Sequence, residues 1–162
     1  MSLTHPFEPV FDKNSSILIL GTFPSVKSRE YGFYYGHPQN RFWKVIASIT
    51  HTSLVPETIE EKKLLLLNNK IALWDILKRC SIKGSSDYSI KNTVPVDLSI
   101  LLEYTHITQI FVNGEKAHQL FMRYFYKNLK KEAIKLPSTS SANAHYTFDK
   151  LVLAWKRVTQ EL

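Results

Sequence analysis

The strongest constraint on the fold is an alternation of short apolar segments with amphipathic ones. Four mainly apolar runs have the length and composition of buried strands. These runs are residues 15–22, 71–77, 107–112 and 133–136. Apolar residues recur at helical spacing in residues 41–49, 115–131 and 147–158, and Pro56 opens a further predicted helix over residues 56–69. Strands that alternate with helices form a parallel sheet with helices on both faces, so the sequence predicts an α/β fold.

A polar or glycine-, proline- or serine-rich element follows each predicted strand. In open parallel sheets, ligands bind outside the carboxyl ends of the strands. Ordinary turn chemistry explains each element taken alone, but their coincidence at one edge of the sheet predicts a site there. The elements are residues 21–25, Asp75, residues 113–114 and residues 137–140. The remaining long connections, residues 25–39 and 79–87, are predicted as loops.

Composition places the chain among intracellular globular proteins. Its 162 residues, 44% of them hydrophobic, suit one domain over residues 1–162. A single cysteine, Cys80, allows no internal disulfide, which is typical of a reducing compartment. The first 14 residues do not have the pattern of a signal peptide, and no apolar stretch has the length of a membrane span. We therefore expect a cytoplasmic protein without a membrane anchor.

Net charge and missing motifs narrow the possible partners. A net charge of +7 favours a polyanionic partner such as nucleic acid. One cysteine excludes iron–sulfur clusters and zinc sites built on several thiolates. No nucleotide-phosphate loop or dinucleotide-binding glycine pattern occurs, and the histidines are scattered. They are His5, His37, His51, His106, His118 and His145. We expect no metal and no cofactor.

Three short motifs carry specific chemistry, and each has a plain structural alternative. The GTFPS run at residues 21–25 allows close approach of a ligand and offers an aromatic face. The STSS run at residues 138–141 suits a phosphate, or else it is a helix-capping turn. Asn40 stands where a loop enters a helix, which is the usual place of an N-cap. Arg41 and Lys44 lie one helical turn apart and either face phosphate or form a solvated pair.

Together these motifs resemble the uracil-DNA glycosylase superfamily and, within it, the hypoxanthine (deoxyinosine) DNA glycosylase branch. The specific signature is the Asn-Arg-Phe-Trp run that ends residues 34–43, followed in order by the Pro-Ser-Thr-Ser loop at residues 137–140. The match also includes residues 72–77, 84–87 and 113–114, and it extends from about residue 17 to residue 144. The resemblance implies a three-layer α/β/α sandwich with a four-stranded parallel central sheet.

The resemblance also implies the reaction and several residue roles. The reaction is hydrolysis of the N-glycosidic bond of a nucleotide flipped out of DNA, as in base excision repair. Relatives often carry an Asp or Asn just after the glycine of the first motif, where this chain has Thr22 and Phe23. The role of that residue then falls on Asn40, whose carbonyl would orient water and whose amide would donate to the leaving base. The role of the second motif, contact with the DNA backbone, falls on residues 138–140.

The resulting site prediction has three groups. Asn40 is the catalytic residue, with the N-cap as its alternative. The predicted base-binding residues are Gly21, Thr22, Phe23 as the stacking residue, and Asn113, for which a strand-end turn is an equal alternative. The predicted DNA-backbone residues are Ser25, Arg41, Ser138, Thr139 and Ser140. Asp75 and Asp87 are the candidates for a glycosidase carboxylate pair, with a turn cap as an equal alternative for each, and Asp75 is interpreted as structural rather than catalytic.

The predicted function is that of a monofunctional, metal-free DNA glycosylase. Its expected partner is DNA that contains hypoxanthine, with uracil or xanthine as further substrates, and the expected oligomeric state is a monomer. No lysine in the motifs suggests a Schiff base, so we expect hydrolysis without strand cleavage. Two alternatives stay open: a module that binds damaged or single-stranded DNA without chemistry, and a hydrolase of free nucleosides or nucleotides.

Overall fold

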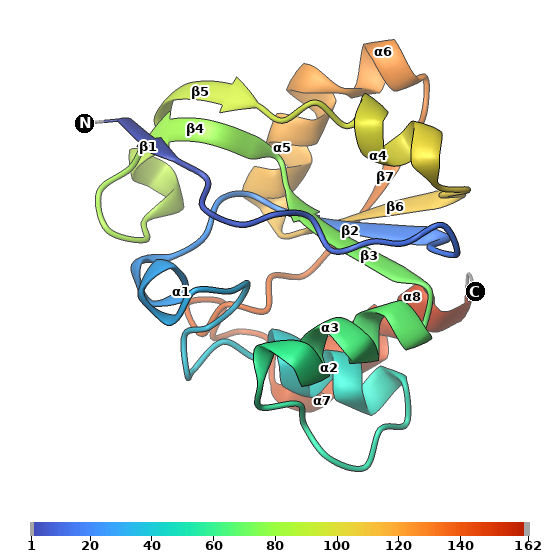
Figure 1. The fold of residues 1–162 in the computed structure, drawn as a ribbon. Coiled ribbons are helices and arrows are strands. Elements are labelled where there is room, and N and C mark those ends of the chain that lie inside the picture. Colours follow the sequence, from blue (N-terminus) through green and yellow to red (C-terminus); the bar gives the residue numbers. More distant parts are fainter. Residues whose placement is uncertain (1, 161–162) are drawn as a thin grey trace.

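A four-stranded parallel sheet forms the centre of the molecule, and the computed structural model describes residues 2–160 (Figure 1). The strand order is β3-β2-β6-β7. The strands are β2 (Ile17–Gly21), β3 (Ile71–Asp75), β6 (Gln109–Asn113) and β7 (Ala133–Leu136). They match the four predicted apolar runs, and the predicted α/β fold with a four-stranded parallel sheet is confirmed.

Each face of this sheet is covered by its own layer of apolar side chains. Along β2, Ile17 and Ile19 belong to one buried cluster and Leu18 and Leu20 to the other. All four side chains are fully buried. Successive side chains of a strand point to opposite faces, so an uninterrupted apolar run is what a strand buried on both sides requires.

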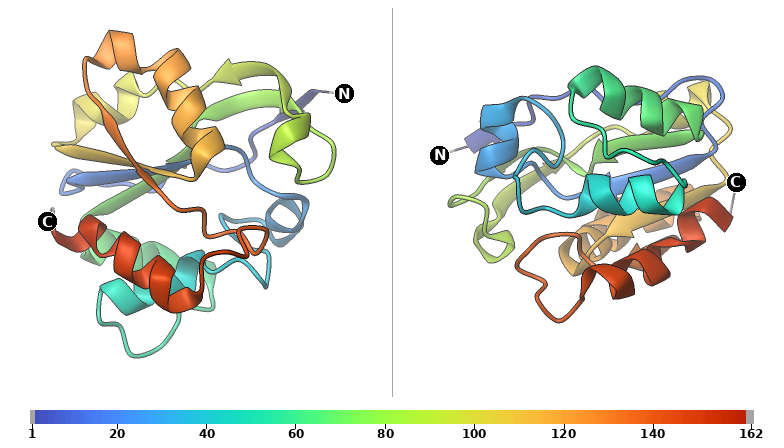
Figure 2. Two further views of the ribbon diagram at one scale, coloured as in Figure 1. Left: turned by 180° about the vertical axis from the view of Figure 1, so that it is seen from behind. Right: turned by 90° about the horizontal axis from the view of Figure 1, so that it is seen from below.

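Helices supply the two outer layers (Figure 2). One face carries α2 (Phe42–Ile49), α3 (Ile59–Asn68), α7 (Phe148–Trp155) and α8 (Arg157–Gln160). The opposite face carries α4 (Ser99–Tyr104), α5 (Glu115–Tyr124) and α6 (Tyr126–Leu129). None of the helices within residues 2–160 combines the length and apolar character needed to cross a membrane.

Several predicted helix limits are corrected by local chemistry. Pro56 does not open α3; Thr58 caps that helix by accepting a hydrogen bond from the Glu61 amide. The predicted helix over residues 115–131 is broken at Phe125. The predicted loop over residues 25–39 begins with a short helix, α1 (Val26–Tyr31).

A second, three-stranded antiparallel sheet lies beside the first, and the sequence did not reveal it. It has the order β1-β4-β5 and consists of β1 (Ser2–Thr4), β4 (Leu77–Ser81) and β5 (Lys91–Pro95). The prediction of a polar loop over residues 79–87 is therefore wrong at its start, because β3 passes almost directly into β4. Only the later part is a loop, and it contains the short 3-10 helix η1 (Asp87–Ser89).

Candidate active site

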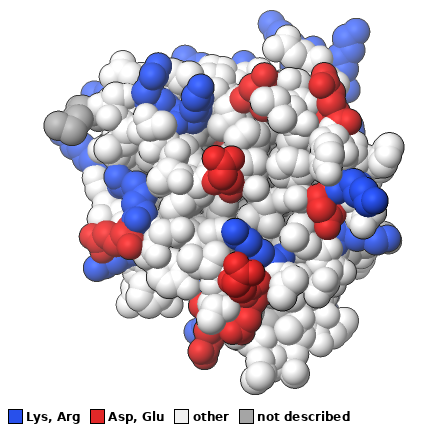
Figure 3. Space-filling model, in the orientation of Figure 1, with Lys and Arg blue, Asp and Glu red and all other residues white. Residues whose placement is uncertain are grey.

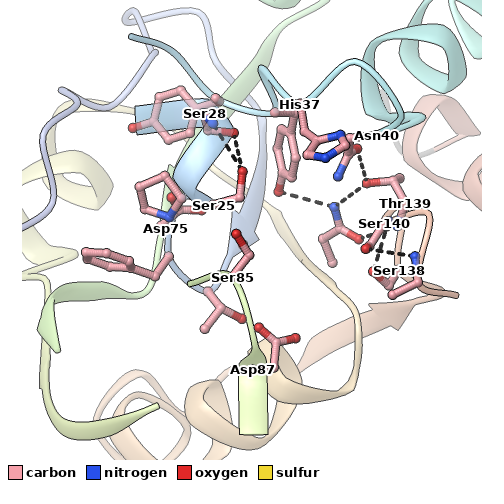
Figure 4. A pocket seen from close by; sticks show the side chains of 18 of the residues that line it. Ser25, Ser28, His37, Asn40, Asp75, Ser85, Asp87, Ser138, Thr139 and Ser140 are labelled. Atoms are coloured by element: carbon pink, nitrogen blue, oxygen red, sulfur yellow. Dashed lines mark hydrogen bonds between the residues drawn. The ribbon is translucent and has the colours of Figure 1, made fainter. Parts of the chain in front are cut away.

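A pocket of about 310 Å³ opens at the carboxyl ends of the parallel strands. The turns after β2, β3, β6 and β7 all reach it, as the sheet-edge argument predicts. Every predicted site residue except Arg41 lines this pocket. Figure 4 shows His37 and Asn40 close to Thr139, with Ser85 and Asp87 at some distance across the pocket.

Asn40 uses one end of its side chain to hold the pocket wall and leaves the other end free. Its Oδ1 accepts hydrogen bonds from the Phe42 amide and from the Thr139 hydroxyl, both at 2.9 Å. The backbone amide is an obligatory donor, which fixes the oxygen of the Asn40 side chain on this side. Among the described residues, nothing accepts a hydrogen bond from Nδ2. The amide is therefore the part of Asn40 that can act on a ligand.

Asn113 and Thr139 extend this contact into a chain of hydrogen bonds (Figure 4). Asn113 Nδ2 donates to the Thr139 hydroxyl at 3.0 Å and to the Tyr35 hydroxyl at 3.2 Å, while its Oδ1 accepts from the Thr139 amide at 3.1 Å. Thr139 is fully buried. Both side chains are thus committed to the wall of the pocket, which suits a positioning role better than contact with a base or a phosphate.

Arg41 holds the loop that follows β7. Its guanidinium donates to the carbonyls of Ser140 at 2.8 Å, of Asn143 at 3.2 Å, and of Tyr146. Its backbone amide and Nε both donate to the Thr139 carbonyl. The rigid fork of donors suits several carbonyls at once. Most of its N–H groups are used within the protein, which favours a loop-fixing role for Arg41 over the predicted phosphate contact.

The three serines predicted to contact the DNA backbone all face the pocket. Ser25 caps α1, since its Oγ accepts from the Ser28 amide at 3.1 Å. Ser138 Oγ accepts from the Ser140 amide, and Ser140 Oγ accepts from the Ala142 amide. Each hydroxyl hydrogen of Ser138 and Ser140 has no acceptor among the described residues, and can be donated to a ligand.

The floor of the pocket is built around Gly21. A methyl group on Gly21 would lie 2.4 Å from Asp75 Oδ1 and 2.6 Å from the Tyr35 hydroxyl. Only glycine therefore allows the carboxylate and the phenol to approach the end of β2 this closely. Thr22 and Phe23 continue the wall, and the Phe23 ring makes an edge contact with the His5 ring at 5.7 Å.

Asp75 is buried and held by a residue from the N-terminal segment. His5 Nε2 lies 2.7 Å from Asp75 Oδ2, and both side chains are almost inaccessible to solvent. His5 Nδ1 accepts a hydrogen bond from the Phe7 amide at 3.1 Å, which places the proton of a neutral ring on Nε2, where it is donated to Asp75. None of the described residues donates to Oδ1, the second carboxylate oxygen.

Tyr35 supplies a neutral hydroxyl beside Asp75. Burial, and after it the nearby Asp75 carboxylate, raise the pKa of Tyr35 far above its ordinary value, although the hydrogen bond from Asn113 opposes this shift. The ring stacks on Phe42 at 4.1 Å. Since the Tyr35 oxygen accepts from Asn113, its own hydrogen is available to a ligand in the pocket.

His5 and Tyr35 were not identified from the sequence. His5 lies in a segment without any motif, 70 positions before Asp75. Tyr35 lies inside an aromatic stretch, and the sequence does not distinguish an aromatic residue of the pocket from one of the core. Within residues 2–160, no group of three or more histidine, cysteine, aspartate or glutamate side chains could hold a metal ion.

Comparisons with known proteins agree with this architecture. The model of the family described as the uracil DNA glycosylase superfamily matches residues 8–159. A hypoxanthine DNA glycosylase from Methanosarcina acetivorans is 35% identical over 142 residues, which cover 87% of this chain and 89% of that protein. A hypoxanthine DNA glycosylase from Methanosarcina barkeri is 37% identical over 112 residues, which cover 68% of this chain and 71% of that protein.

A solved structure has the same fold. It is the solution NMR structure of a candidate uracil DNA glycosylase from Methanosarcina acetivorans, 31% identical in sequence. The two structures superpose with a TM-score of 0.80, covering 98% of this chain and 99% of the other.

Proposed function

This chain belongs to the uracil DNA glycosylase superfamily, and we propose that hypoxanthine is the deaminated base that this DNA glycosylase removes. Uracil and xanthine are proposed as weaker substrates. The proposed reaction is hydrolysis of the N-glycosidic bond without cleavage of the strand, by a monomer that needs no metal.

The observation that carries this proposal is the free oxygen of the buried Asp75 carboxylate. An ionised carboxylate only accepts hydrogen bonds, and the bond from His5 leaves Oδ1 facing the pocket. Deamination of adenine gives hypoxanthine, whose N1 carries a hydrogen where adenine N1 accepts one. Deamination of cytosine gives uracil, whose N3 likewise carries a hydrogen where cytosine N3 accepts one. A carboxylate at the pocket floor therefore favours the deaminated forms over their parent bases.

Selection also acts before the base reaches the pocket. A base must leave the duplex to enter a pocket, and a poorly paired base leaves at lower cost. Guanine carries the same ring N–H as hypoxanthine, but its pairing with cytosine keeps it in the stack. The proposed preference for deaminated bases thus combines weak pairing with the acceptor Asp75.

The chemistry follows from the donors that remain free. As the glycosidic bond breaks, negative charge develops on the leaving base, and the Asn40 amide and the Tyr35 hydroxyl can donate to it. Donors fixed in advance stabilise developing charge without reorganising. Both Asn40 acceptor sites are occupied by protein donors, so donation to the base, rather than orientation of water, is the role that we propose for Asn40.

Acidic and basic side chains are mixed on the face of the molecule seen in Figure 3. Acidic side chains lie near its middle and at its edges, and a basic group lies among those near the middle. The net charge of +7 is therefore not gathered over that face. We place the DNA across the mouth of the pocket, which opens near α1 and the loop after β7.

The test uses labelled oligonucleotides that carry one hypoxanthine, uracil or xanthine, with adenine as the control base. After incubation, alkali cleaves the strand wherever a base has been lost. We expect excision of hypoxanthine first, much slower excision of adenine, and no cleavage before alkali. Asn40→Asp should excise hypoxanthine about a hundredfold more slowly, and Asn14→Asp, in an exposed loop, should equal the wild type. Binding without excision would instead favour a non-catalytic module, and excision from free deoxyinosine alone would favour a nucleoside hydrolase.

A further inference from the structure

The part of the loop after β7 that lines the pocket lacks a side chain large enough to fill the gap left by an extruded nucleotide. Its residues 138–142 are serine, threonine and alanine, and Tyr146, further along the loop, does not line the pocket. Extrusion costs the stacking and pairing energy of the nucleotide, and an inserted side chain can offset part of that cost. The other side of the pocket, formed by the loop between β4 and β5, is therefore of interest.

Tyr88 is the most exposed large hydrophobic residue within residues 2–160, with a relative exposure of 101%. It lies in η1, and the neighbouring Asp87 and Ser85 line the pocket. The Tyr88 ring is therefore attached beside the mouth of the pocket and can contact another molecule. A single exposed aromatic residue needs no explanation in general, but this one is placed at the rim of a site for an aromatic ligand.

The loop that carries Tyr88 is tied to the body of the protein. Ser85 Oγ accepts from the Val26 amide at 3.0 Å, and Arg29 Nη2 donates to the Gly84 carbonyl at 3.2 Å. Within the loop, Ser89 Oγ accepts from the Lys83 amide at 2.8 Å and donates to the Ser86 carbonyl at 2.7 Å. These contacts hold the loop against α1, so that Tyr88 is presented at a defined place.

Charge next to Tyr88 suits the backbone of nucleic acid. Lys83 and Lys91 flank the loop, and both residues are exposed. An aromatic ring can stack on a base, and lysines on the same loop can contact the neighbouring phosphates. The rim opposite Asn40 therefore offers a stacking group with cations on either side.

We propose that Tyr88 stacks on the base pair next to the gap and holds the duplex open while the nucleotide occupies the pocket. This inference rests on the proposed function, since it concerns DNA from which a base has been extruded. Stacking of one base on an aromatic side chain changes binding by about tenfold or more. The effect should depend on the ring and not on the hydroxyl.

The first experiment compares excision of hypoxanthine from a duplex and from the same strand alone, under single-turnover conditions with subsaturating enzyme. We expect Tyr88→Ala to lower the duplex rate about tenfold and to leave the single-strand rate unchanged, because only the duplex needs to be held open. Tyr88→Phe should behave like the wild type. Tyr104→Ala serves as the matched control, since Tyr104 is also exposed but lies on α4, at the other end of the sheet.

A second experiment does not depend on catalysis. A duplex with a tetrahydrofuran abasic-site analogue carries 2-aminopurine next to the analogue, and its fluorescence reports stacking of that base. Wild type and Tyr88→Phe should change the fluorescence on binding, and Tyr88→Ala should not. Equal behaviour of wild type and Tyr88→Ala, or equal losses on duplex and single strand, would overturn the inference. Failure of the proposed function would appear separately, as absence of excision with the fluorescence change intact.

Discussion

Asn40 and Thr139, which are 99 positions apart in the sequence, share a 2.9 Å hydrogen bond across the pocket. The bond joins the two stretches that carry the family signature, and it turns the amide of Asn40 away from the protein. Asn40 is therefore both a structural contact of the loop after β7 and the proposed donor to the leaving base. Its two functions reside on different atoms, so substitutions can separate them.

Substitution of Asn40 by aspartate keeps both acceptor contacts and removes the amide donor. We expect single-turnover excision to fall about a hundredfold, as for loss of one preorganised donor, with a free energy of unfolding within about 1 kcal/mol of the wild type. Asn40→Ala should lose both excision and about 1 kcal/mol of stability. Excision rates and urea denaturation measure the two effects. Normal excision by Asn40→Asp would remove the amide from the mechanism.

Arg41 provides a test of loop fixing against phosphate contact. Arg41→Ala should lower the free energy of unfolding by about 2 kcal/mol or more, because several carbonyls lose a charged donor. Arg41→Lys should recover little of this loss, since an ammonium group lacks the planar fork. If Arg41 does not touch DNA, the salt dependence of DNA binding should keep its slope in both variants. A slope of the salt dependence that is smaller by about one unit in Arg41→Ala would instead indicate that Arg41 contacts a phosphate. Arg157→Ala on α8 is the control.

Substitutions of His5 and of Asp75, which form a hydrogen-bonded pair, should affect different properties. His5→Ala leaves the buried carboxylate without its donor and should cost about 2 kcal/mol of stability. Asp75→Asn replaces the free acceptor oxygen by a group that can also donate, so the ratio of hypoxanthine to adenine excision should fall. Competition assays with both bases measure that ratio. An unchanged ratio in Asp75→Asn would exclude Asp75 from base recognition.

Asp87 predicts a dependence of stability on pH. Asp87 lies in an exposed loop but lines the pocket, where partial desolvation raises the pKa of its carboxyl in the folded protein and Lys116 opposes the shift. The folded state then holds more protons than the unfolded state between the two pKa values, so this group makes stability fall as pH rises through that window. Asp87→Asn has no carboxyl to titrate and therefore does not lose this stability. The free energy of unfolding of Asp87→Asn minus that of the wild type should increase with pH and then level off. Urea titrations at several pH values from 3 to 7 measure the difference, and a constant difference would contradict the shift.

Removal of divalent metal should leave excision unchanged. The proposed mechanism uses amide, hydroxyl and carboxylate groups of the chain itself, and the described residues form no cluster of metal ligands. Excision is measured before and after dialysis against excess chelator. Activity that disappears with chelator and returns with an added metal would contradict the proposed mechanism.

The pattern of apolar and amphipathic segments is sufficient to predict the central sheet and most of the pocket. Runs such as residues 17–20 are apolar without interruption, and only a strand buried on both faces makes such a run favourable. The carboxyl ends of parallel strands share one edge, so the turns after the four strands had to meet. Composition and local spacing are sufficient for these conclusions because they depend on periodicity and not on particular contacts.

Which atoms are free to act in the pocket depends on contacts between segments that are remote in the sequence. Arg41 was expected to bind phosphate, but the carbonyls of residues 139–146 occupy its donors, and those carbonyls come from about a hundred positions further along the chain. His5 reaches Asp75 because β1 pairs with β4 and the chain then passes that residue. A hydrogen bond needs its two partners within about 3 Å, and no sequence pattern encodes such a distance between remote segments. Whether a particular oxygen or amide is free to contact a ligand therefore depends on how the remote segments pack against each other.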